Sequence, residues 1–159
     1  MMICTNRDII LLNKRLDRVS RSEVYFPTQI SGVSIYDKLQ SSSDGGFHSA
    51  NETYKIRIPL IAKVQNGKIY LPETHYDALT EEEAAAHWTI HTEDLIIVSA
   101  TGFENFNSSA IETAAVTMQQ AEEIADSVGF QKELIRIVEY SDNTLRGITA
   151  LKHWRIGGV

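Results

Sequence analysis

The sequence Thr-Tyr-Lys-Ile-Arg-Ile-Pro-Leu at residues 53–60 decides the fold class. Every second residue is apolar, from Tyr54 to Leu60, with lysine and arginine between the first three. This two-residue period predicts a β-strand with one buried and one exposed face. Asn66-Gly67 follows after five residues and is typical of a hairpin turn, here leading into a second strand, Lys68–Leu71.

Further strand-like stretches lie on both sides of this one: Arg7–Asn13, Val24–Tyr36, Trp88–Ile90, Leu95–Ser99, Lys132–Tyr140 and Ile148–Ile156. The strands do not alternate with helices, which disfavours a parallel, doubly wound sheet. We therefore predict a mainly β (α+β) fold: a small antiparallel β-barrel or sandwich with one long inserted amphipathic helix. At 159 residues, the chain is expected to form a single domain over residues 1–159.

The inserted helix is predicted over residues 108–128. Ser109 and Glu112 have the spacing of a capping box, and Gly129 stands where a glycine commonly ends a helix. An apolar stripe rich in alanine, including Ala115 and Ala121, recurs every three or four residues. We also expect a shorter helix within Glu73–Ala86.

Four residues are predicted to serve in interactions. Residues 40–51 are small and polar and predict a flexible loop that becomes ordered on a partner, with Phe47 and His48 at its centre. Near the C-terminus, Trp154 is either a core residue of the last strand or an aromatic anchor at a subunit contact, and Arg155 follows it.

The net charge of −6 hides an uneven distribution of charge. From Glu73 to Asp126 there are 12 acidic residues and no lysine or arginine, whereas the remainder carries a net charge of +6. This segment is either a solvated acidic face or one half of a chain polarised for contact with a basic partner, such as its own neighbour. An acidic segment of this length disfavours binding to phosphates.

Composition and sequence also limit the cellular setting. No apolar run approaches the length of a membrane span, and the first 20 residues lack the apolar block of a signal peptide. The single cysteine, Cys4, excludes an internal disulfide and favours a reducing, intracellular location.

No catalytic constellation is recognisable. His87 and His91, with Glu83, would share one face of a helix and could bind zinc there. The residues between the two histidines favour a strand, which would separate them by roughly 13 Å. There is no phosphate-binding glycine loop and no nucleophile elbow. We expect no catalytic residue, no metal site and no cofactor.

The order of segments resembles that of small structural proteins encoded in the head–tail modules of phages and prophages of Gram-positive bacteria, especially head-closure (stopper or neck) proteins. The segments that carry the resemblance are Asp8–Lys14, Thr28–Ser34, Lys55–Pro59, Glu93–Val98 and Leu151–Gly158. The resemblance implies a small β-barrel with projecting loops and no catalytic residues. It also implies a virion location, in a ring of copies between a portal or adaptor and the tail. DNA would pass through the lumen without sequence-specific binding, and no membrane would be involved.

Three other functions remain open from the sequence. A tail-terminator or tail-completion protein would also form a ring in the same particle. A small metal-dependent or hydrolytic enzyme would need His87 and His91 to converge. A DNA-binding regulator is disfavoured because the isoelectric point is about 5.3 and the predicted long helix carries no lysine or arginine.

Overall fold

The computed structural model describes residues 7–17, 21–40, 51–99, 115–145, 147–148 and 151–159. Its strands are β1 (Arg7–Leu16), β2 (Glu23–Gln40), β3 (Asn51–Pro59), β4 (Lys63–Val64), β5 (Ile69–Tyr70), β6 (His87–Trp88), β7 (Leu95–Ser99), β8 (Gly129–Asn143) and β9 (His153–Gly158). Its helices are the 3-10 turn η1 (Gln65–Gly67) and the α-helices α1 (Glu73–Asp77), α2 (Glu81–Ala84) and α3 (Met118–Val128).

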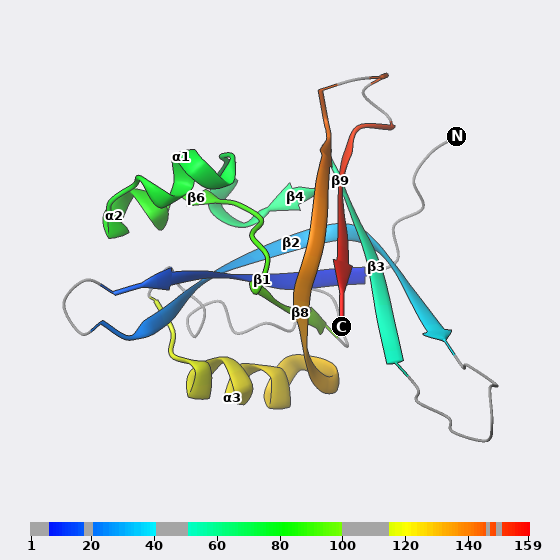
Figure 1. Cartoon of the computed structure of the whole chain (residues 1–159), viewed down its shortest axis with the longest axis horizontal. Helices are drawn as coiled ribbons and strands as arrows, with labels where there is room; N and C mark the ends of the chain where they lie inside the picture. The colour runs from blue at the N-terminus through cyan, green and yellow to red at the C-terminus, as the bar shows by residue number, and fades with distance from the viewer. Residues whose placement is uncertain (1–6, 18–20, 41–50, 100–114, 146, 149–150) are drawn as a thin grey trace.

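Seven strands form one large antiparallel sheet in the order β1-β7-β8-β9-β3-β2-β4, with an additional β1–β2 pairing. Two long strands are each shared between two groups of partners. β2 pairs with β1 through its first half and with β3 through its second half, and β8 pairs with β7 and then with β9. In Figure 1, β3, β8 and β9 cross the direction of β1 and β2.

The predicted fold class is therefore confirmed in part. The protein is mainly β and its large sheet is antiparallel, but the sheet is not a closed barrel. The partner of β2 changes from β1 at Val33 to β3 at Ser34. The alternation of apolar and polar residues within a strand does not show where that strand changes partners. The sequence pattern therefore could not predict whether the sheet closes into a barrel.

Two apolar clusters lie on opposite faces of β1. Ile9 and Leu11 belong to the larger cluster, which includes side chains from β2, β3, β7, β8 and β9. Ile10 and Leu12 belong to the smaller cluster, which lies under α3. Because both faces of β1 are covered, its central residues are a continuous apolar run rather than an alternating one.

The helix predicted over residues 108–128 begins later than expected, and a long inserted helix is not shown. Residues 108–114 lie outside the described part of the chain, and Val116 forms an isolated β-bridge with Tyr25. Helix α3 begins at Met118, after a capping box in which Thr117 and Gln120 exchange hydrogen bonds of 2.9 and 3.3 Å. Ala115, predicted to lie on the buried stripe, is exposed and outside the helix.

Three other local predictions also need correction. The turn at Asn66-Gly67 exists, with both residues at positive φ, but it is not a hairpin turn. The strand before it, β4, pairs with β2, and the strand after it, β5, pairs in parallel with β6. Leu60 is 40% exposed because β3 ends at Pro59. The segment Glu73–Ala86 forms two short helices, α1 and α2, instead of one. Among the described residues, no helix is long and apolar enough to cross a membrane.

Candidate functional site

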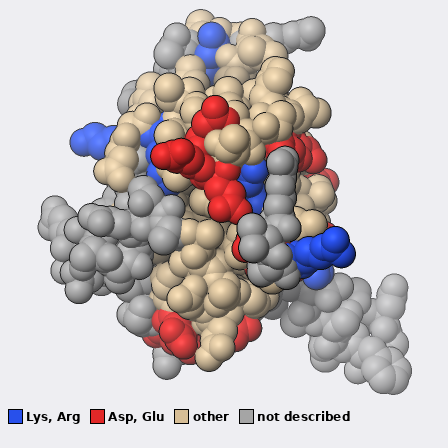
Figure 2. Space-filling model, turned by 90° about the vertical axis from the view of Figure 1, so that its left-hand side faces the viewer, with Lys and Arg blue, Asp and Glu red and all other residues tan. Residues whose placement is uncertain are grey.

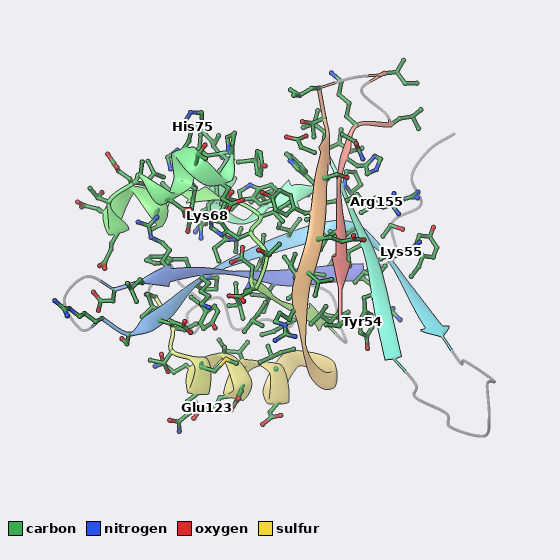
Figure 3. All side chains as sticks on the ribbon, viewed as in Figure 1. Tyr54, Lys55, Lys68, His75, Glu123 and Arg155 are labelled. Atoms are coloured by element: carbon green, nitrogen blue, oxygen red, sulfur yellow. The ribbon has the colours of Figure 1, made fainter. Side chains whose placement is uncertain are left out.

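The outer surface of β3 and β9 carries a basic face, which we define as Lys55, Arg57 and Arg155. Arg57 and Arg155 are direct partners across the β3–β9 pair, so their side chains leave the sheet on the same side. All three side chains are exposed, and within the described part of the chain none of them forms an ion pair. Figure 3 shows Lys55 and Arg155 on this side of the molecule. The basic face is therefore available to an anionic partner.

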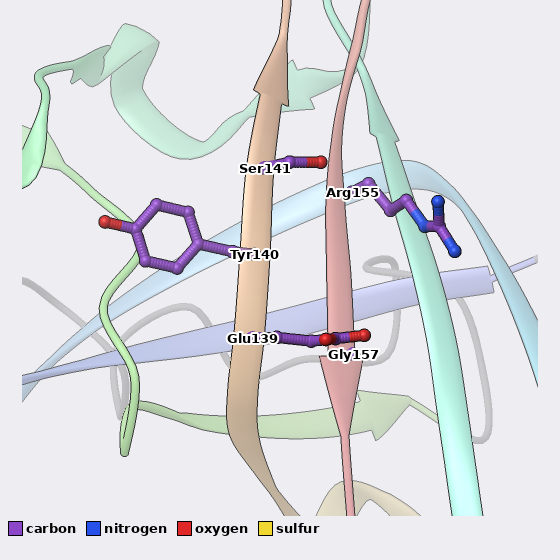
Figure 4. A pocket seen from close by; sticks show the side chains of 5 residues that line it. All are labelled: Glu139, Tyr140, Ser141, Arg155 and Gly157. Carbon is purple, nitrogen blue, oxygen red and sulfur yellow. The ribbon is translucent and has the colours of Figure 1, made fainter.

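A shallow hollow of about 240 Å³ lies beside Arg155, along β8 and β9. Figure 4 shows Glu139 and Ser141 on the same side of β8, with Tyr140 pointing the opposite way. Gly157 provides the space for Glu139, because a Cβ atom at residue 157 would lie 2.7 Å from the Glu139 Cγ. The hollow is mainly polar and places one carboxylate at the border of the basic face.

An acidic face lies over α1 and α2, which we define as Asp77, Glu81, Glu82 and Glu83. All four side chains are exposed. Thr80 and Glu83 form a capping box at the start of α2, so this helix begins with three consecutive glutamates near its positive end. Figure 2 shows Asp and Glu side chains gathered over this segment, with a second group over α3.

Beneath α1, a buried network is centred on Asp94. Its carboxylate accepts hydrogen bonds from the Asn13 Nδ2 at 2.8 Å, the Lys14 backbone N–H at 2.8 Å and the His91 backbone N–H at 2.9 Å. The Asn13 side chain also bonds to both backbone groups of Thr89. A buried carboxylate with this many donors is fixed in position, and it ties β1 to the segment before β7.

The imidazole of His91 links this network to α1. Its Nδ1 lies 3.1 Å from the Asp94 Oδ2, and its Nε2 lies 2.9 Å from the Asp77 Oδ1. Burial alone would lower the pKa of His91, but the hydrogen bond to Asp94 and the charges of Asp94 and Asp77 raise it above 6.5. The Glu73 carboxylate lies close by and accepts a short hydrogen bond from the Tyr140 hydroxyl, which raises the pKa of Tyr140 to about 12.

The sequence-predicted interaction residues fall in three different places. Trp154 is only 6% exposed and packs with Tyr70 and Trp88, with ring centroids 4.8 and 4.9 Å away, so its burial favours the core interpretation over an exposed anchor. Arg155 is exposed on the basic face. Phe47 and His48 lie outside the described residues, as does most of the predicted loop at residues 40–51.

Of the two histidines considered as a metal site, His87 lies on the short strand β6 and His91 lies in the segment that follows it, and they have different hydrogen-bond partners. The His87 Nδ1 lies 2.8 Å from the carbonyl oxygen of Glu83, whereas His91 turns toward α1. The sequence reasoning missed Glu73 and Asp77 as neighbours of His91. Their spacing of four residues within a predicted helix was a signal for a shared face, but not for what that face would contact.

A family model describing a family of unknown function, DUF6751, matches residues 4–159 of this chain. Neither the curated proteins nor the solved structures contain a match to it. Because the family model covers nearly the whole chain, the protein belongs to the DUF6751 family.

Proposed function

We propose that the chain is a structural subunit that assembles with copies of itself into a ring. The basic face of one copy would contact the acidic face of the next. The observation that carries this proposal is the presence of Lys55, Arg57 and Arg155 on β3 and β9, without ion-pair partners in the described chain, while exposed carboxylates gather over α1 and α2. A contact between two different patches of the same protein closes into a ring when the rotation allows it.

In the finer form of the proposal, this ring lies at the head–tail junction of a phage or prophage particle. The support for this location is the resemblance to head-closure proteins. The ring would join a portal or adaptor to the tail, DNA would pass through it, and the protein would be part of the virion. A tail-terminator or tail-completion ring would use the same contact and is the alternative location.

The charges predict a weak and salt-sensitive contact. Exposed ion pairs are each worth about 0.2–1 kcal/mol and are screened over about 8 Å at physiological ionic strength. Three or four such pairs do not hold two copies together at low concentration. At physiological salt the free subunit is therefore expected to be monomeric and to form the ring on a partner that holds several copies close together, whereas low salt strengthens the contact between free copies.

Charge-swap variants test the contact directly. Native mass spectrometry and cross-linking at low salt should detect self-association of the wild-type protein. The double variant R57E/R155E should lose it, and so should E81K/E82K. A mixture of the two variants should recover heterologous dimers, because the charges are complementary again. The variant K63E/R136E makes the same change of charge at exposed positions outside the basic face and serves as the control.

Recovery in the mixture is the decisive result, because loss of folding cannot produce it. If R57E/R155E associates as well as the wild-type protein, the basic face is not part of the contact. The head–tail location is tested separately by mass spectrometry and reconstruction of purified particles from the source strain. Particles that lack the chain would overturn the location and leave the contact standing.

A further inference from the structure

We propose that Glu73, Asp77 and His91 form a binding site for one zinc ion, between α1 and the segment before β7. The ligand atoms are the Nε2 of His91 and one carboxylate oxygen from each acidic residue, and all three lie within 4.8 Å of one another. The site shares Asp77 with the acidic face, whereas Glu73 and His91 lie outside that face, and the proposal does not depend on the contact between copies.

The imidazole of His91 is held in the orientation that a metal ligand requires. The side chain is only 10% exposed, and its Nδ1 lies 3.1 Å from a carboxylate oxygen of the fully buried Asp94. Histidines that bind metals usually donate the N–H of their other ring nitrogen to such a carboxylate. This pairing directs the Nε2 to the carboxylate of Asp77, at 2.9 Å.

The two carboxylates come from α1, which brings them to the same side of the imidazole. Glu73 and Asp77 are the first and last residues of this helix and have a spacing of four residues, which places both side chains on one face. Asp77 is 55% exposed, so its carboxylate can rotate toward a bound ion. Ligands about 2.1 Å from a tetrahedral zinc ion are ~3.4 Å apart, which small rotations of these side chains would achieve.

The balance of charge around His91 also favours a cation. Glu73, Asp77 and Asp94 surround one imidazole, so their negative charge exceeds the positive charge of even a protonated His91. The nearby basic side chains are engaged elsewhere. The Nζ of Lys14 lies 3.1 and 3.2 Å from Glu23 and Glu93.

The guanidinium of Arg15 donates to the carbonyl oxygens of Tyr76 and Leu79. Arg15 therefore bonds to the backbone at and just after α1, and among the described residues it forms no ion pair with the carboxylates of Glu73 and Asp77. A divalent ion would supply the missing positive charge.

The ligand set and the surrounding space indicate the class of ion. One imidazole and two carboxylates suit zinc, because an imidazole ligand favours transition metals over calcium and magnesium. The three residues belong to the lining of a hollow of about 270 Å³ that also includes Thr92. Three protein ligands leave a fourth tetrahedral position, which a water molecule could fill from this hollow.

Zinc binding is measured by isothermal titration and by metal analysis after dialysis, with tag-free full-length protein. We expect one equivalent of zinc per chain, and no comparable binding of magnesium or calcium. Loss of a partner outside the ligand shell of a metal site costs about 10–100-fold in affinity, so E73Q and D77N should each lower zinc affinity by at least this factor.

Two control variants separate this site from adventitious binding. H75Q removes an exposed histidine on the same helix, and E82Q removes an exposed carboxylate on α2. Both should leave the affinity and the stoichiometry unchanged. His91 is buried, so H91Q could unfold the chain; D77N changes an exposed side chain and avoids this difficulty.

Substitution with cobalt(II) adds a spectroscopic test. A tetrahedral site gives intense visible absorption bands that free cobalt lacks, and D77N should weaken them. The proposal is wrong if zinc fails to bind stoichiometrically, if E73Q and D77N bind it as the wild-type protein does, or if H75Q abolishes binding.

Discussion

One buried lysine, Lys68, should make a contribution to the stability of the protein that rises with pH above neutrality. Its side chain is 7% exposed, and its Nζ donates hydrogen bonds to the carbonyl oxygen of Pro27 at 2.8 Å and to the Thr28 Oγ1 at 3.3 Å. Within the described residues no carboxylate forms an ion pair with it. Figure 3 shows Lys68 between the segment that contains α1 and α2 and strand β2.

Burial lowers the pKa of Lys68 from 10.5 to about 8. Between these two pH values the unfolded chain holds a proton that the folded chain has lost, so the free energy of unfolding increases as the pH rises. The full difference in pKa corresponds to about 3 kcal/mol, of which about 1.5 kcal/mol should be gained between pH 8 and pH 9.5. The range ends at pH 9.5 because the tyrosines of the unfolded chain ionise near pH 10.

Urea denaturation at several pH values between 7 and 9.5 measures this effect. The variant K68M has no titrating group at this position and should lose the rise, whatever its absolute stability. K63M removes an exposed lysine and should keep it. Because the raised pKa values of His91 and Tyr140 act in the opposite direction in both proteins, the difference in slope between them isolates Lys68. A K68M variant with the same slope as the wild-type protein would refute the assignment of the charge penalty to Lys68.

Two further predictions concern packing. Ala121 is fully buried on the inner face of α3, so A121E should cost several kcal/mol in the free energy of unfolding. A115E, at an exposed position, should change it by less than about 0.5 kcal/mol, and thermal denaturation of both variants checks the contrast. A Cβ atom at Gly158 would lie 2.5 Å from the Ile135 Cγ2 and 3.1 Å from a backbone oxygen, so G158A should lower the melting temperature more than G157A, whose new methyl group meets a movable glutamate side chain. Equal shifts for both glycine variants would show that the sheet relaxes around residue 158.

The parts of the fold that depend on local patterns could be predicted from the sequence. The alternation after Tyr54 correctly indicated a strand with Ile56 and Ile58 buried. The beginning of α3 could not be predicted in the same way, because two capping boxes compete in the sequence. Helix α3 begins after Thr117, next to Val116, which pairs with Tyr25 of a distant strand, and local spacing carries no information on that contact.

The candidate metal site shows the same limit more strongly. His91 was considered for its spacing from His87, four residues away, yet its actual neighbours are Asp77 and Glu73. A pair of residues on one face of a helix is a local feature that the sequence reveals. The element that this face contacts is set by the packing of the whole chain, and here it is the turn before β7.

The structure also shows that only part of the acidic stretch between Glu73 and Asp126 can take part in an external contact. Asp94 is fully buried and bonded inside the protein, so it contributes nothing to an external contact. The exposed carboxylates over α1 and α2 remain. Among the basic residues, Arg57 and Arg155 lie directly across from each other on β3 and β9, and like charges in such positions destabilise a sheet. An anionic partner placed between the two guanidinium groups would remove this repulsion. Binding of such a partner would therefore stabilise the β3–β9 pair, which a contact at scattered surface charges would not do. For this reason the positions of the two arginines support the proposed contact between copies better than the charge totals do.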